Sequence, residues 1–124
     1  MHKAWSNLET IQLGRKLLAD PNLVNDPINK IGEPSNVLIR KEVFEKVEVF
    51  DHDLFQLIDV DMWFRIMGHY KIGFVDKPLS YFQIHPQQQT YKNMKRGENL
   101  LDNHRLAYKI LKEPAYNFLS QDLK

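Results

Sequence analysis

The sequence predicts a small α/β domain of the α+β-like kind, with about three short strands and four to five helices. Its 124 residues, 43% hydrophobic and 27% charged, suit a single folded domain over residues 1–124. Apolar residues recur at helical spacing after Asp59, which predicts a helix with one buried face. Short apolar runs bounded by Gly, Pro or Asp predict strands. Three short strands make a poor sheet alone, so the elements indicate the second half of an α/β protein.

Composition narrows the classes of function. A net charge of +1 argues against binding nucleic acid through bulk electrostatic attraction. No apolar run approaches the ~20 residues that span a bilayer, and the first residues lack the apolar core of a signal peptide. The absence of cysteine excludes disulfides, thiolate metal sites and cysteine nucleophiles. These features predict a cytoplasmic protein and leave peripheral attachment to a membrane open.

The first half of the chain contains two expected helices and one expected strand. Ser6 and Glu9 have the spacing of a capping box, which predicts a helix over residues 5–19 that ends at Asp20 and Pro21. The following elements are expected to be a loop, a strand and a helix, at residues 22–35, 36–40 and 41–47.

The second half begins with an ordered loop and then the strongest helical pattern of the chain. Val60, Trp63, Phe64 and Met67 follow the i, i+3, i+4, i+7 rule, so we expect core positions in a helix that ends at residue 68 or 69. Asp59 would be its N-cap, and Asp61 would lie in its first turn. The remaining elements are expected to be strands at 71–75 and 79–84, a polar segment at 86–97 and helices at 98–112 and 115–123.

Four aspartates and one histidine are the candidates for chemistry. Asp51 and Asp53, like Asp59 and Asp61, form an Asp-x-Asp pair that could share a divalent cation, since such ions prefer several oxygen ligands. The pattern alone favours a structural role for the same residues, as turn formers, a cap and a partner for the helix dipole. His85 ends an expected strand, where its side chain could enter a cleft or serve a structural role. The sequence has no glycine-rich phosphate loop, G-x-S-x-G elbow or H-E-x-x-H motif.

Four short motifs, in a fixed order, resemble the C-terminal half of family 2 glycosyltransferases with the GT-A fold. The resemblance covers about residues 28–92 and leaves helical flanks at 1–27 and 93–124. The four motifs are IGEPSNVLIR (31–40), FDHDL (50–54), DVDMWFR (59–65) and KPLSYFQIH (77–85), the last followed by Gln88.

The resemblance implies a nucleotide-diphospho-sugar donor, a divalent Mn or Mg ion and an acceptor hydroxyl. Asp59 matches the general base of the family, and an aspartate at a helix start is favoured in its ionised form. Asp61, Trp63, Gln83 and His85 match positions on the substrate side, and His85 would also approach the metal or the diphosphate. The matched positions depart from the family in three places. Ile58 replaces a Glu, Gln83 replaces an Arg, and Glu48-Val49 replaces a Gly-Gly pair.

The family's donor half, with its metal-binding Asp-x-Asp, has no counterpart before residue 28. We therefore expect the acceptor side of a glycosyltransferase, whose parent enzyme transfers a sugar to a carbohydrate or lipid-linked acceptor. This chain alone would bind no metal and have no transferase activity. Unpaired strand edges predict a homo-oligomer. The alternatives are a non-catalytic binding or assembly module and an unrelated small α+β interaction domain.

Overall fold

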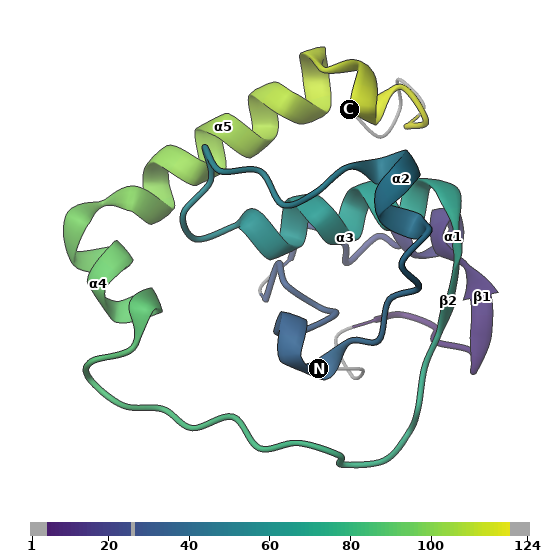
Figure 1. Cartoon of the computed structure of the whole chain (residues 1–124), viewed down its shortest axis with the longest axis horizontal. Helices are drawn as coiled ribbons and strands as arrows, with labels where there is room; N and C mark the ends of the chain where they lie inside the picture. Colours follow the sequence, from purple (N-terminus) through teal and green to yellow (C-terminus); the bar gives the residue numbers. More distant parts are fainter. Residues whose placement is uncertain (1–4, 26, 120–124) are drawn as a thin grey trace.

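The structure is a computed structural model that describes residues 5–25 and 27–119. Over these residues it is a mixed α and β structure with five α-helices and one two-stranded sheet, which confirms the α+β class (Figure 1). No described helix is long and apolar enough to cross a membrane. The elements are β1 (Ile11–Leu13), α1 (Gly14–Leu18), η2 (Pro34–Asn36), α2 (Val43–Val47), α3 (Ile58–His69), β2 (Lys71–Gly73), α4 (Gln89–Arg96), α5 (Glu98–Lys112) and η3 (Pro114–Tyr116).

Helix α3 is the central element, and α1, α2 and η3 pack around it (Figure 1). All its residues from Asp59 to Gly68 are buried, so this helix faces protein on every side. A helix buried all round must satisfy its polar groups internally, because water cannot reach them. The predicted helix at 59–69 and its apolar core positions are therefore confirmed, with the helix beginning at Ile58.

The sheet joins segments that lie about sixty positions apart in the chain. Strands β1 and β2 are antiparallel, and Gln12 is opposite Ile72. Directly after β1, Gly14 lies against the backbone of α3, where a Cβ atom would come within 2.3 Å of the Met67 carbonyl oxygen. Its N–H donates to the Tyr70 carbonyl at 2.9 Å. Only glycine permits this close approach of α1 to α3.

Helices α4 and α5 form a bent pair along the outer edge of the molecule (Figure 1). Gly97 joins them with a φ of 70°, the left-handed conformation that glycine adopts readily. The buried side chain of Asp102 on α5 accepts N–H bonds from Phe55, Gln56 and Leu57, just before α3. A carboxylate from α5 therefore holds the backbone that leads into the central helix.

The predicted helix at 5–19 is wrong in its first half. The Ser6 backbone N–H and hydroxyl both donate to the Asp20 carboxylate, at 2.9 and 2.8 Å, so Ser6 does not cap a helix. Glu9 exchanges two hydrogen bonds with the Gln12 side chain. Residues 11–13 form β1 because β2 offers them a partner, and only residues 14–18 are helical.

Two of the three predicted strands are also wrong. Residues 36–40 and 79–84 form no strand, and the segment 74–88 crosses an open side of the molecule as an exposed arc (Figure 1). An apolar run forms a strand only where another strand satisfies its backbone, and only β2 within the predicted 71–75 has such a partner. The polar segment 86–97 contains α4, which was not predicted.

The remaining predictions hold in part. Helices α2 and α5 confirm the expected helices at 41–47 and 98–112. The predicted helix at 115–123 is replaced by the short η3, and its residues 120–123 lie outside the described residues.

Candidate functional site

The candidate site is centred on Asp59, in the first turn of α3. Leu57 is the N-cap, so the prediction that Asp59 caps the helix is wrong by two positions. One carboxylate oxygen of Asp59, Oδ1, accepts the Val60 N–H at 2.8 Å. The residue is only 8% exposed. Asp59 is therefore held close to the helix backbone with a small part of its surface open to solvent.

The loop at residues 28–33 holds the other carboxylate oxygen. The Asn29 amide donates to Asp59 Oδ2 at 2.6 Å, and Asn29 Oδ1 accepts the Gly32 N–H at 2.9 Å. The Trp63 indole donates to the Gly32 carbonyl at 3.0 Å, so α3 itself anchors this loop. Asn29 thereby joins the loop to the candidate base and restricts the orientation of its carboxylate.

The environment of Asp59 sets its protonation. Burial is the main cause that raises the pKa of Asp59 to about 6, and the nearby Glu33 charge contributes to this increase. Together they outweigh the hydrogen bonds from the Val60 N–H and the Asn29 amide, which lower the pKa. The sequence predicted that the helix start would favour the ionised form of Asp59. The pKa is raised instead, because desolvation of the carboxylate outweighs these hydrogen bonds. A carboxylate with this pKa is mostly ionised at pH 7 and more basic than an ordinary aspartate. It therefore suits a general base.

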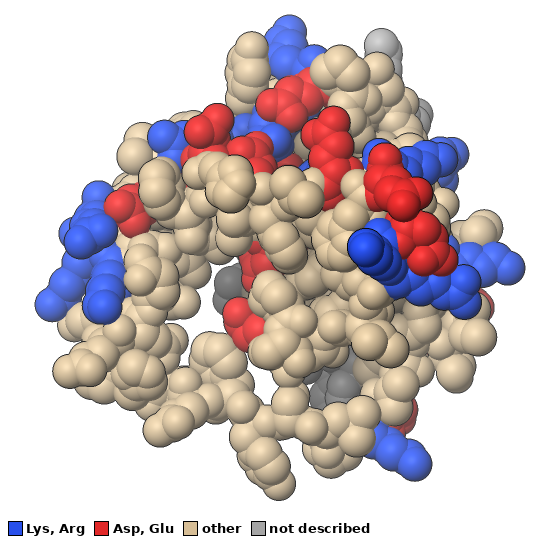
Figure 2. Space-filling view, viewed as in Figure 1, with Lys and Arg blue, Asp and Glu red and all other residues tan. Residues whose placement is uncertain are grey.

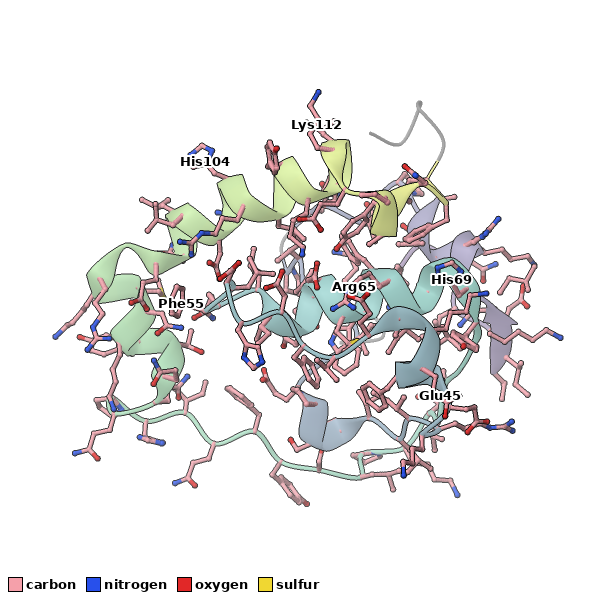
Figure 3. All side chains as sticks on the ribbon, turned by 45° about the horizontal axis from the view of Figure 1, so that its top comes forward. Glu45, Phe55, Arg65, His69, His104 and Lys112 are labelled. Carbon is pink, nitrogen blue, oxygen red and sulfur yellow. The ribbon has the colours of Figure 1, made fainter. Side chains whose placement is uncertain are left out.

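Asp61 lies two residues further along α3, fully buried in an ionic network. Arg65 donates to its Oδ2 through Nε at 3.0 Å and Nη2 at 2.7 Å, and the Tyr116 hydroxyl donates to its Oδ1 at 2.6 Å. Lys109 Nζ lies 3.5 Å from the same Oδ1. Arg65 also donates to carbonyls of the 47–49 segment, and its side chain points into the molecule (Figure 3). Protein groups occupy both oxygens of Asp61, which gives this residue a structural role.

The Asp51-x-Asp53 pair belongs to the same network and forms a turn. Asp51 Oδ1 accepts the Asp53 N–H at 2.9 Å, and Asp51 pairs with Lys109, which lowers the pKa of Asp51. Lys109 also lies 3.1 Å from Glu113. A cavity of about 550 Å³ opens beside this turn, against α5. Asp51 and Asp53 are thus turn formers with a lysine partner, as one of the two readings of the sequence expected.

The other predicted site residues lie in two different environments. Trp63 is a core residue at 3% exposure, and its aromatic ring meets Phe50 edge-on. Gln83 and His85 lie on the exposed 74–88 segment. His85 Nδ1 accepts the Gln87 N–H at 3.2 Å, which holds the ring in its own turn.

The 74–88 segment borders an opening in the molecular surface. Figure 2 shows this opening between the segment and the body of the molecule, with acidic side chains at its margin. Among the described residues, no three His, Asp or Glu side chains lie close enough together to hold a metal ion. The metal and substrate roles of His85 stay predictions.

Two residues of the site were not anticipated from the sequence. Asn29 and Glu33 fall in the segment that was expected to be a loop, and the sequence assigned neither of them a role in the site. The spacing of Asn29 and Gly32 is a local signal for a turn closed by an Asn side chain. Nothing in that spacing indicates the long-range contact with Asp59.

Comparisons with known proteins identify one longer relative. The chain is 29% identical over 114 residues to a protein of Mycobacterium tuberculosis named uncharacterized protein MT1568. The match covers 92% of this chain and 36% of that protein, so the chain spans about a third of the length of the curated relative it matches. No family model matches the chain, and no solved structure does.

Proposed function

We propose that this chain forms the acceptor side of a GT-A glycosyltransferase of family 2, with Asp59 as the general base. The observation that carries the proposal is the setting of Asp59, which lies in the first turn of a buried helix, held by Asn29, with a pKa raised to about 6. Four motifs in the order of the resembled family support the same role. The acceptor is a hydroxyl of a carbohydrate or lipid-linked molecule.

The proposed reaction is a single inverting displacement. Asp59 takes the proton of the acceptor hydroxyl while the acceptor oxygen bonds to the anomeric carbon of the donor sugar. The bond from that carbon to the diphosphate oxygen breaks, and the nucleoside diphosphate leaves with the bonding electron pair. Asn29 keeps the Asp59 carboxylate oriented toward the hydroxyl by its 2.6 Å hydrogen bond. Glu33 raises the basicity of Asp59 through its negative charge.

The donor and its metal require residues beyond those described here. The family implies a divalent metal, but the described residues include no cluster of three possible ligands, so they do not fit a metal site. No step above depends on a metal held by this chain. The greater length of the mycobacterial relative is compatible with a donor-binding part elsewhere in a longer polypeptide.

The backbone at Glu48 gives the resemblance independent support. Glu48 has a φ of 62° and a ψ of −171°, a conformation that is almost restricted to glycine. The resembled family has a Gly-Gly pair at this point, before Phe50-Asp51. A glycine-type conformation at a non-glycine residue is unusual, so its position just before the matched FDHDL motif favours the alignment.

Ligand titration of the isolated chain tests the acceptor half of the proposal. We expect saccharides to shift the amide NMR signals of Asn29, Gly32 and Val60, which surround Asp59. Uridine- and guanosine-diphospho-sugars with manganese should bind with a millimolar or weaker Kd by calorimetry, because most donor contacts are missing. Micromolar donor binding would contradict the assignment to the acceptor side.

The base role requires a polypeptide in which a donor half precedes this sequence. There, Asp59→Asn should abolish sugar transfer without changing the far-ultraviolet circular dichroism. Glu33→Gln should retain transfer but move the acidic limb of the pH profile to lower pH, since the charge that raises the Asp59 pKa is removed. Saccharide binding with no transfer in any such polypeptide would instead indicate the non-catalytic binding module.

Self-association remains part of the proposal. The expected homo-oligomer was based on three strand edges, two of which the structure does not form. Large apolar side chains on the 74–88 arc still offer a contact surface, since Leu79, Tyr81 and Ile84 are exposed. Sedimentation velocity at tens of micromolar, roughly the range for weak pairing, tests it.

A further inference from the structure

Helix α5 turns a row of large apolar side chains toward solvent. Its inner face is buried through Asp102 and Leu106. The opposite face carries four apolar residues that are each more than half exposed, and His104 lies among them. Figure 3 shows His104 and Lys112 pointing away from the body of the molecule. The four exposed apolar residues are Leu100, Leu101, Tyr108 and Leu111.

Helix α4 extends this row with further apolar side chains and with cations. Tyr91 and Met94 are exposed, and the Lys95 ammonium lies 4.7 Å from the centre of the Tyr91 ring. Lys92 and Arg96 add two more positive charges, and Figure 2 shows a basic cluster at the edge of the molecule where α4 lies. We refer to the outward surfaces of α4 and α5 together as the α4–α5 face.

The charge of this region differs from that of the rest of the chain. Residues 89–112 contain six Lys or Arg and two Asp or Glu, whereas the other residues contain eleven and fourteen. Of the two acidic residues in the region, Asp102 is fully buried, and the Glu98 side chain is only 19% exposed. Two of the six cations, Arg105 and Lys109, turn inward to Asp102 and Asp51. The four others carry the positive charge of the α4–α5 face, and they are Lys92, Lys95, Arg96 and Lys112.

We propose that the α4–α5 face docks on the surface of an anionic lipid membrane. Helices that lie in the interface of a bilayer combine an apolar stripe with Lys and Arg, which bury their apolar side chains at the headgroup boundary and attract anionic lipids. The exposed leucines and Tyr108 supply the stripe on α5, and the cations of α4 and Lys112 flank it. This inference does not depend on the proposed transferase activity.

Charge favours a membrane over two other partners. A second copy of the chain would bring the same cationic flanks together, which opposes pairing across this face. A nucleic acid would use the cations but leave the exposed leucines without a partner. An anionic lipid surface satisfies both the positive charge and the apolar side chains.

Vesicle flotation with the full 124-residue chain tests the proposal. We expect binding to phosphatidylcholine vesicles that contain about 30% phosphatidylglycerol, and at least about tenfold weaker binding to pure phosphatidylcholine. Leu100→Gln/Leu111→Gln should weaken binding to the anionic vesicles by about tenfold or more. Lys95→Glu/Arg96→Glu should weaken it by about twentyfold or more. Salt at about 0.5 M should do the same, because it shortens the Debye length and screens the attraction to the anionic lipids.

Matched control variants distinguish binding through the α4–α5 face from non-specific adsorption to vesicles. Leu38→Gln and Lys41→Glu/Lys71→Glu change exposed residues on other parts of the surface and should leave vesicle binding unchanged. All the substituted side chains are exposed, so thermal unfolding should be unaffected.

Three results would overturn the proposal. The first is no binding of the unmodified chain to anionic vesicles. The second is equal binding by all variants. The third is a concentration-dependent dimer in solution that Leu100→Gln/Leu111→Gln abolishes, because it would assign the face to a second copy.

Discussion

The Asn29 side-chain amide donates a 2.6 Å hydrogen bond to the Asp59 carboxylate, thirty positions further along the chain. This bond makes the 28–33 loop part of the candidate site, because Asn29 also accepts the Gly32 N–H and Trp63 holds the Gly32 carbonyl. The loop and the first two turns of α3 therefore form one unit. A change in either part is transmitted to the carboxylate that we propose as the base.

Asp59 should make the stability of the chain depend on pH. Its folded-state pKa of about 6 lies above the ordinary aspartate value of 3.8, so the folded state binds a proton more tightly than the unfolded state. The stability of the wild type relative to Asp59→Asn is then greatest below pH 4 and falls as the pH rises to about 6. We expect a loss of about 2 kcal/mol across this range, measured by urea unfolding. Asp53→Asn, at an exposed position, is the control, and an equal pH dependence in both variants would contradict the prediction.

Gly14→Ala should destabilise the chain by about 3 kcal/mol or more. The added methyl group would lie 2.3 Å from the Met67 carbonyl oxygen, and backbone atoms of α3 cannot move aside cheaply. Thermal unfolding gives the measurement. Gly73→Ala is the matched control, because its nearest neighbour would be 3.9 Å away and we expect little change. A Gly14→Ala variant as stable as the wild type would show that α1 and α3 do not cross so closely.

Asp102→Ala should cost about 3 kcal/mol of unfolding free energy. The substitution leaves the N–H groups of Phe55, Gln56 and Leu57 without their carboxylate acceptor at the start of α3. Asn103→Ala, at the exposed neighbouring position, should change the stability far less. Hydrogen exchange should show selective loss of protection at residues 55–57 in an Asp102→Asn variant, and unchanged protection there would argue against this anchoring role of Asp102.

Arg65→Met should destabilise the chain by about 3–5 kcal/mol, because it leaves Asp61 as a buried carboxylate without its main cation. The double variant Asp61→Asn/Arg65→Met should recover part of that loss, since the uncompensated charge is gone. Chemical denaturation of the single and double variants measures the coupling between the two residues. Strictly additive effects would indicate that the 2.7 Å ion pair makes no net contribution.

The spacing of apolar residues along the sequence predicted the helices that have one regular apolar face. The apolar spacing of Val60, Trp63, Phe64 and Met67 predicted α3, and α2 and α5 followed from similar spacing. On α5, however, periodicity did not reveal which apolar residues would face solvent. Leu100 and Leu111 are exposed because the opposite side of the helix, with Leu106, packs against the body.

The sequence by itself determined the α+β class, the central helix and the position of Asp59 at its start. Tertiary structure alone decided the sheet, because β1 forms only where β2 satisfies its backbone. It also decided the chemistry of the aspartates. Asp59 acquires a raised pKa because burial removes water from it, whereas Asp61 is occupied by Arg65 and Tyr116. Burial and partners from distant segments are properties of the folded chain, and no local spacing encodes them.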